Sequence, residues 1–258
     1  DDIISKNNLH PSSETSFHAL IKHKYVLHVH STATIANAIS QSSESDLKKY
    51  LDEDFIFIPY CRPGFTLTME IKKLILPSTN ILILENHGLI VAGDDIEDTY
   101  KLLLKIHKKL DLIRNEKLAF DYLEEITNID GYNHKNTDKY KLFSTQNEKL
   151  FSLFPKSFYP DHVIFLGPGI PTFLEEKEAN EFIQNLKRKN MNLPPYLILK
   201  YKGLFENTLA IPAAKEMIDC FLEVLLRIDL SKSLKFLSSQ QESELLNWDI
   251  EIYRQSIN

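Results

Sequence analysis

The spacing of apolar and polar residues changes several times along the first half of the chain. Apolar residues alternate or form short runs in four segments, which predicts strands over 25–30, 55–58, 80–86 and 89–92. Helical spacing between these segments predicts helices over 15–22, 32–40, 45–51, 66–76 and 95–120. We expect Ser12 or Ser13 to cap the first of these helices. Strands that alternate with helices are typical of an α/β fold with a central, mixed sheet.

The second half of the chain has a weaker pattern. Residues 121–160 are polar and aromatic without a clear period, and we interpret them as a linker that runs over the surface. The pattern then predicts a strand over 162–166, a helix near 176–190, a hairpin with strands 196–200 and 204–206, and helices near 212–228 and 239–256. We therefore expect a domain over residues 1–120, the linker over 121–160, and a smaller α+β segment over 161–258.

Three histidines and one glutamate are the main candidates for chemistry. His28 and His30 are two residues apart on a predicted strand, so their side chains point to the same face. His87 follows another predicted strand, and Gly88 beside it permits a close approach of the backbone or a tight turn. Three neutral imidazoles and a nearby carboxylate, here Glu14, are the groups that a catalytic zinc site needs.

Each of these residues also has a simpler structural interpretation. A His-x-His pair can arise by chance in a chain that contains 9 histidines. A lone histidine at the end of a strand, like His87, is more often a satisfied polar residue than a ligand. Glu14 alone resembles a carboxylate at the start of a helix. The prediction of a metal site therefore depends on the combination of the four residues.

Composition and charge narrow the classes of function. The chain has 258 residues, of which 43% are hydrophobic and 26% charged, as in ordinary globular proteins. A formal net charge of −6 argues against nucleic acid as a partner, because neutralising phosphates needs a basic face. No apolar run is long enough for a membrane span, and two cysteines fit the reducing cytoplasm, where we expect the protein to act. The dinucleotide-binding pattern Gly-x-Gly-x-x-Gly is missing from the sequence, which argues against a redox enzyme.

Three motifs together resemble those of the class II aldolase/adducin family. They are Pro-Ser-Ser-Glu-Thr-Ser-Phe-His at 11–18, His-Val-His at 28–30 and Asn-His-Gly-Leu-Ile-Val-Ala-Gly at 86–93. The resemblance covers residues 10–115, and segments 159–165 and 247–254 are similar to the C-terminal extension of longer aldolase-like members. This family includes fuculose- and rhamnulose-phosphate aldolases and ribulose-phosphate 4-epimerases.

The resemblance implies a three-layer α/β/α fold and a role for each motif residue. It implies that His28, His30 and His87 bind zinc or another divalent transition metal, and that Glu14 is the general acid/base. It also implies that Ser12 and Ser13 form part of a pocket for the substrate phosphate. Relatives are homotetramers with active sites near subunit boundaries, so we expect a homo-oligomer that acts on a small sugar phosphate or a related ketose.

The start of the chain departs from the family pattern. Family members usually have some tens of residues before the first motif, including a Gly-Asn element and a Ser-Gly turn that help to hold the substrate phosphate. This sequence opens at Asp1 without them, which we interpret as a truncation. If the full protein also lacks them, it does not bind phosphate as its relatives do.

Three functions compete at this stage. The first is a lyase, a zinc-dependent aldolase that cleaves a ketose reversibly through a metal-stabilised enediolate. The second is a 4-epimerase, which uses the same cleavage but re-forms the bond after the aldehyde rotates. The third is a non-catalytic, adducin-like assembly module, which lacks the metal histidines. All three histidine positions are filled here, which favours an enzyme.

Overall fold

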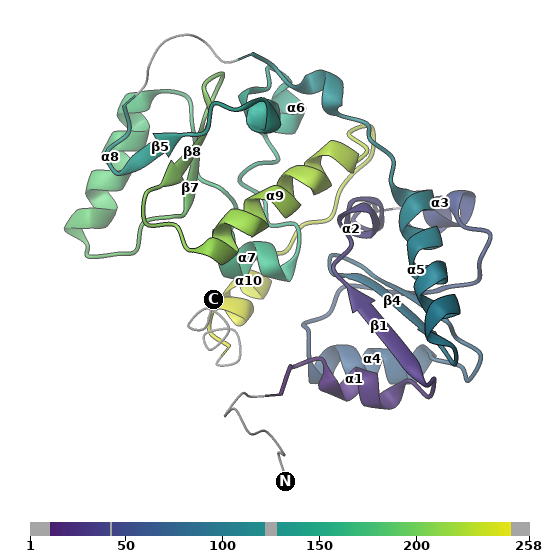
Figure 1. Ribbon diagram of the computed structural model, residues 1–258. Coiled ribbons are helices and arrows are strands. Elements are labelled where there is room, and N and C mark those ends of the chain that lie inside the picture. Colours follow the sequence, from purple (N-terminus) through teal and green to yellow (C-terminus); the bar gives the residue numbers. More distant parts are fainter. Residues whose placement is uncertain (1–10, 42, 122–127, 249–258) are drawn as a thin grey trace.

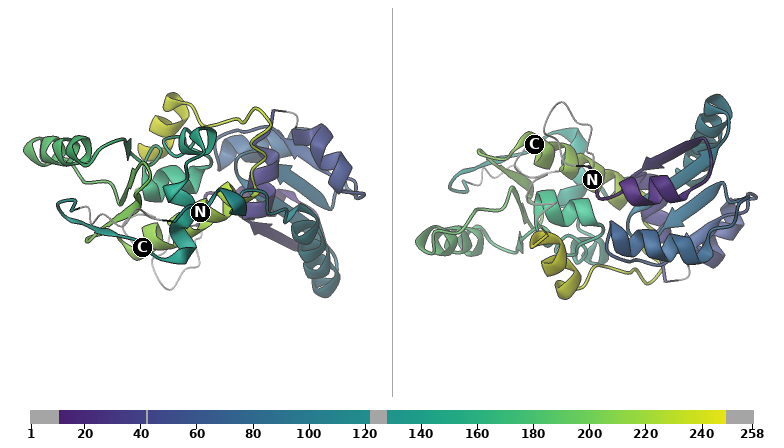
Figure 2. Two further views of the ribbon diagram at one scale, coloured as in Figure 1. Left: turned by 90° about the horizontal axis from the view of Figure 1, so that it is seen from above. Right: turned by 90° about the horizontal axis from the view of Figure 1, so that it is seen from below.

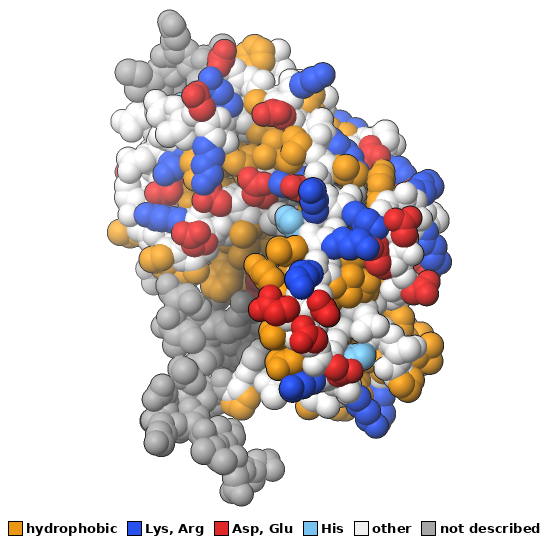
Figure 3. All heavy atoms as spheres, turned by 45° about the vertical axis from the view of Figure 1, so that its right-hand side comes forward, with side chains coloured by type: hydrophobic (Ala, Val, Ile, Leu, Met, Phe, Trp, Pro, Cys, Tyr) orange, Lys and Arg blue, Asp and Glu red, His pale blue; other side chains and the backbone are white. Residues whose placement is uncertain are grey.

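The computed structural model describes residues 11–41, 43–121 and 128–248. Within these residues it contains two four-stranded sheets, which lie side by side with helices packed against each of them (Figures 1 and 2). None of the described helices combines the length and the apolar character needed to cross a bilayer. Acidic and basic side chains are interspersed over the face of the molecule in Figure 3.

The first sheet is mixed, as the sequence predicts. Its strands, in spatial order, are β1 (Tyr25–Val29), β4 (Gly88–Gly93), β3 (Ile81–Leu84) and β2 (Ile56–Ile58). Strand β4 is antiparallel to both of its neighbours, whereas β2 and β3 are parallel. The predicted mixed sheet is confirmed.

Helices cover both faces of this sheet, because successive side chains of a strand point to opposite faces. Ile81 and Ile83 of β3 pack with α2 (Thr32–Ala38), α3 (Ser43–Tyr50) and α5 (Ile96–Leu110). Leu82 and Leu84 pack on the other face with α1 (Thr15–Leu20) and α4 (Phe65–Leu74). These four strand side chains are at most 2% exposed. The predicted three-layer α/β/α arrangement is therefore confirmed.

Helix α5 ends at Leu110, well before the predicted end near Phe120. The chain turns away because the backbone N–H groups of Arg114 and Asn115 donate to the carbonyl of Leu226, at 2.9 and 3.1 Å. A short 3₁₀ helix, η1 (Glu116–Leu118), follows. The periodicity of the sequence continues through this segment, but a tertiary contact ends the helix.

The second sheet has the spatial order β5, β8, β7, β6. These strands are β5 (Tyr132–His134), β6 (Thr172–Phe173), β7 (Tyr196–Leu199) and β8 (Gly203–Asn207). Helix α8 (Glu176–Arg188) packs on one face, and α9 (Pro212–Arg227) packs on the other. The predicted hairpin and the helices near 176–190 and 212–228 are confirmed. Helix α10 covers Ser239–Leu246, and residues 249–256 of the predicted helix lie outside the described residues.

The prediction that residues 121–160 form a linker over the surface is wrong. The described part of 121–160 does not run over the surface, because it contains β5, η2 (Asp138–Ser144) and α6 (Glu148–Phe151) and buries Phe143, Phe154 and Phe158 completely. These aromatic residues are irregularly spaced, so they give no periodic signal. The proposed domain boundaries themselves stay a prediction.

The segment predicted as a strand over 162–166 is the helix α7 (Pro160–Leu166). Most of its residues are buried, and a short buried run has no periodicity that separates a strand from a helix. Pro160 stands at the first helical position, where proline favours a helix start.

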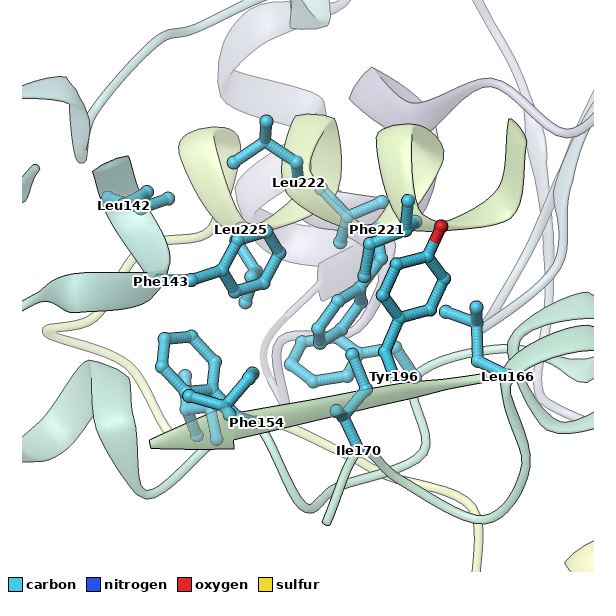
Figure 4. Packing of buried hydrophobic residues seen from close by; sticks show 14 of the residues in the cluster. Leu142, Phe143, Phe154, Leu166, Ile170, Tyr196, Phe221, Leu222 and Leu225 are labelled. Carbon is cyan, nitrogen blue, oxygen red and sulfur yellow. The ribbon is translucent and has the colours of Figure 1, made fainter. Parts of the chain in front are cut away.

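The two sheets belong to one continuous structure, because they share a hydrophobic cluster. Ile35, Ala36 and Ile39, from α2 and its C-terminal end, pack into the cluster formed by the second sheet and α9. Figure 4 shows Phe221 and Leu225 of α9 facing the aromatic side chains of this cluster. The domain with the predicted metal residues is therefore held firmly against the C-terminal unit, which we define as residues 128–248.

Candidate metal centre

The sheet brings the three histidines to one edge. His28 lies on β1 and His30 directly follows it, whereas His87 lies in the turn before β4. Because β1 and β4 are antiparallel and Val29 pairs with Leu89, the end of β1 lies beside the start of β4. This topology places residues 28–30 next to residue 87.

Gly88 is needed at the point where β1 and β4 meet. A Cβ atom at this position would lie 2.4 Å from the carbonyl oxygen of Val29 and 3.1 Å from the Cα of His30. The expected close approach of the backbone is confirmed. The preceding Asn86 has a positive φ of 54°, a conformation that asparagine tolerates better than most residues.

Glu14 is held beside the histidines by the short helix α1. Phe17 of α1 is fully buried and packs edge-on against the His28 ring, with centroids 5.3 Å apart. Ser16 shares a 2.6 Å hydrogen bond with Thr68 of α4. These contacts fix α1 against the sheet, so the residue before it faces the histidine cluster.

Four ligand atoms converge in this arrangement. Oε1 of Glu14 lies 3.1 Å from Nε2 of His87, 3.2 Å from Nε2 of His28 and 3.7 Å from Nε2 of His30. Nε2 of His30 lies 3.1 Å from Nε2 of both other histidines. Zinc bonds of about 2.0–2.1 Å separate tetrahedral ligand atoms by about 3.3 Å. The donor set and its spacing therefore fit a divalent transition metal.

The Nδ1 atoms of two histidines have their own partners. Nδ1 of His28 lies 3.0 Å from the carbonyl oxygen of Leu89, to which it can only donate. Nδ1 of His30 lies 2.5 Å from Oδ2 of Asp161, a residue of α7. A partner of this kind fixes the tautomer and turns the Nε2 lone pair toward an ion.

Sequence reasoning missed Asp161. The residue lies in the segment 159–165, whose resemblance to longer family members was the only available signal. No periodic pattern reports a contact between residues that are 131 positions apart.

Burial and hydrogen bonds set the charges of the cluster. Burial disfavours the ionised form of Glu14, but hydrogen bonds with the three histidines outweigh it and hold the pKa of Glu14 well below its usual value. Burial lowers the pKa of His87 to about 4. Burial also disfavours protonation of His30, but Asp161 and Glu14 raise the pKa of His30 to about 10. At neutral pH and without an ion, the site thus holds an ionised carboxylate, a neutral His87 and a protonated His30, which would release its Nε2 proton when a metal binds.

The two serines lie beside this cluster but not within it. The Ser12 hydroxyl accepts a 3.2 Å hydrogen bond from the backbone N–H of Glu14, and the Ser13 side chain lies beside Gly64. Neither serine caps α1, because Glu14 occupies the N-cap position and makes no capping hydrogen bond, so that prediction is wrong. Their contact with a substrate phosphate stays a prediction.

Fold and site together define an α/β/α domain with a histidine and carboxylate cluster at the edge of its sheet. Residues 1–112 match the model of the family described as the Class II Aldolase and Adducin N-terminal domain. Residues 1–112 of this chain are therefore similar to the N-terminal domain of class II aldolases and adducins.

Curated and solved relatives cover only parts of the chain. This chain is 28% identical over 118 residues to the "Uncharacterized oxidoreductase YuxG" of Bacillus subtilis (strain 168). The aligned region covers 45% of this chain and 17% of that protein. The N-terminal class II aldolase domain of a Thermoplasma acidophilum protein is 29% identical, with a TM-score of 0.37 over 39% of this chain and 46% of that one. YgbL of Klebsiella pneumoniae, a candidate aldolase, epimerase or decarboxylase, is 24% identical, with a TM-score of 0.32 over 39% of this chain and 55% of its own. The chain thus spans a small fraction of the curated relative that it matches.

Proposed function

We propose that this protein is a metal-dependent lyase that cleaves a carbon–carbon bond of a sugar phosphate or a related ketose by a reversible aldol reaction. The observation that carries the proposal is the convergence of three Nε2 atoms and one carboxylate oxygen within 4.8 Å of one another. The match of residues 1–112 to the class II aldolase and adducin N-terminal domain supports the same reaction class.

Each residue of the cluster has a role in this proposal. His28, His30 and His87 would hold zinc or another divalent transition metal. When bound, the ion would supply Lewis-acid polarisation of the ketose carbonyl and stabilise the charge that develops as the carbon–carbon bond breaks. Glu14 would move the proton at the carbon that carries this charge, because its ionised carboxylate lies at the histidines and can accept a proton there.

The simplest test is a cleavage assay with the zinc-loaded protein. A panel of ketose phosphates is incubated with the protein, and release of a three-carbon ketone is followed with a coupled reductase. We expect cleavage of at least one ketose, and loss of that activity after treatment with a chelator. Inversion at one carbon without release of aldehyde would assign the 4-epimerase instead. A protein that binds zinc but neither cleaves nor epimerises any ketose would contradict the proposal.

A further inference from the structure

A carboxylate from the C-terminal unit reaches into the candidate metal centre of the N-terminal domain. Asp161 lies on α7, and its Oδ2 is 2.5 Å from Nδ1 of His30. Asp161 is 7% exposed, so the contact is shielded from solvent. In Figure 1 the C-terminal end of β1 points toward α7, which is the direction of this contact.

The contact leaves the other ring nitrogen of His30 for a metal. A neutral imidazole that donates from Nδ1 has its lone pair on Nε2. Nε2 of His30 is the atom that lies 3.1 Å from Nε2 of both His28 and His87. Asp161 therefore stabilises the tautomer and the ring orientation in which His30 can act as a ligand.

His30 is also the histidine that most needs an external partner. The side chains of His28 and His87 are 5% exposed. The side chain of His30 is 32% exposed, and the residue lies beyond the last hydrogen-bonded position of β1. A more exposed side chain at the end of a strand has more rotamers available, and a buried carboxylate restricts it to one of them.

The same unit also holds the turn that carries His87. The side-chain amide of Asn86 donates to the carbonyl oxygens of Phe158 and Lys235, at 2.8 and 3.0 Å. Nζ of Lys235 lies 2.5 Å from Oε1 of Glu85. Two separate segments of the C-terminal unit thus contact the residues next to His87. The C-terminal unit therefore touches the metal centre at these residues as well as through Asp161.

We propose that Asp161 is a positioning residue of the metal centre, through which the C-terminal unit orients His30 toward the ion. The inference rests on the metal centre of the proposed function, but it does not depend on aldol cleavage. Asp161 touches His30 through Nδ1, on the opposite side of the ring from the other ligand atoms, so its role is separate from that of a direct ligand.

The test compares zinc affinity, measured by competition with a chromophoric chelator, among variants of the full chain. We expect Asp161→Ala to weaken zinc binding about 10–100-fold, the range found when a partner of a metal-bound histidine is removed. Asp161→Asn keeps an oxygen that accepts from Nδ1 and nearly the same shape, so its loss should be smaller. The visible spectrum of the cobalt-substituted Asp161→Ala protein should also change, because it reports ligand geometry.

Asp111→Ala is the matched control. Asp111 also joins the N-terminal domain to the C-terminal unit, through Oδ1 contacts of 2.7 and 2.6 Å with the Arg227 guanidinium, but it does not touch the histidines. A structural role alone would make both variants less stable and leave their zinc affinity unchanged.

The outcomes separate this inference from the proposed function. If Asp161→Ala binds zinc as tightly as the unchanged protein and gives the same cobalt spectrum, Asp161 is not a positioning residue. If the unchanged protein binds no zinc, the metal centre and this inference both fail. If Asp161→Ala does not fold, Asp161→Asn and the ¹⁵N shift of His30 Nδ1 in the zinc-loaded protein give the answer. An unprotonated Nδ1 in that spectrum would overturn the inference.

Discussion

At the scale of single residues, the charge of Glu14 determines what the candidate centre can do. The carboxylate is half-buried, which alone would raise its pKa, but the three imidazoles hold the pKa below its usual value. A carboxylate that stays ionised can accept a proton from a substrate carbon, and it can also approach a metal ion. Removal of the charge without a change of shape separates these two roles.

We expect Glu14→Gln to keep its zinc and to lose most of its turnover. The three histidines remain as ligands, but an amide cannot accept the proton, so kcat should fall about 10²–10⁴-fold. Zinc content and the rate of ketose cleavage are measured on the same preparation. An unchanged rate would remove Glu14 from the chemistry, whereas loss of zinc would make it a required ligand.

His162, next to Asp161, gives the protein a pH dependence that does not involve the metal centre. It is fully buried, neither ring nitrogen has a hydrogen-bond partner among the described residues, and burial lowers its pKa from 6.5 to about 3. Between these two values the unfolded chain binds the proton and the folded protein does not. The contribution of the neutral His162 to the free energy of unfolding is therefore fully present above pH 6.5. It is lost progressively as the pH drops toward 3.

The expected contribution of this residue is about 1.4 kcal/mol per pH unit, or about 2 kcal/mol between pH 7 and pH 5. His162→Phe keeps an aromatic ring between Phe158 and Phe221 but has no group that titrates there. We therefore expect its free energy of unfolding to fall by about 2 kcal/mol less than that of the unchanged protein when the pH drops from 7 to 5. Urea unfolding of both proteins at the two pH values measures the difference. Equal losses in the two proteins would show that His162 titrates normally in the folded state.

At the scale of elements, the junction of β1 and β4 has little room for an added side-chain atom. Gly88→Ala places a Cβ atom 2.4 Å from the carbonyl oxygen of Val29, so the two strands must separate. We expect the free energy of unfolding to fall by about 1–3 kcal/mol, the usual cost of overpacking, and zinc content to fall with it. Gly131→Ala is a control, because a Cβ there meets no atom within 4 Å and carries only the strain of a positive φ. If Gly88→Ala were no more destabilised than this control, the strands would not be in contact at this position.

The elements also show what the sequence could predict. Strands such as 81–84 and helices such as 212–227 were correctly predicted, because their apolar residues recur with a regular period. Helix α7 was predicted as a strand because a short, almost fully buried segment has no such period. The end of α5 was misplaced because hydrogen bonds to Leu226, far along the chain, end the helix.

At the scale of the whole molecule, the candidate centre combines local motifs with contacts between distant segments. Glu14, His28, His30 and His87 could be predicted because short motifs contain them, and the sheet brings these motifs together. Asp161 could not, because only the folded chain brings α7 next to β1. The aromatic cluster between the two sheets was missed for the same reason, since its members come from segments without regular spacing.

The contact between the two units can be tested through Asn86. We expect Asn86→Gly to lower the free energy of unfolding by about 1–3 kcal/mol, because the carbonyl groups of Phe158 and Lys235 lose their donor while glycine tolerates the positive φ. Asn190→Gly is a matched control, since Asn190 has a similar φ of 52° but is exposed on the surface. Urea unfolding of both variants measures the effect. Equal stability of the two would mean that the Asn86 bonds do not hold the units together.

The central claim is that His28, His30 and His87 form a metal site, and the metal content of the purified protein tests it most directly. Elemental mass spectrometry should find about one zinc, or another divalent transition metal, per chain in the unchanged protein. His28→Ala should lose this metal. His134→Ala should keep it, because His134 lies in the second sheet, where its Nε2 is bonded to the carbonyl oxygen of Lys202. An unchanged protein that holds no metal and takes up none from added zinc, or a His28→Ala variant with full zinc content, would contradict the claim.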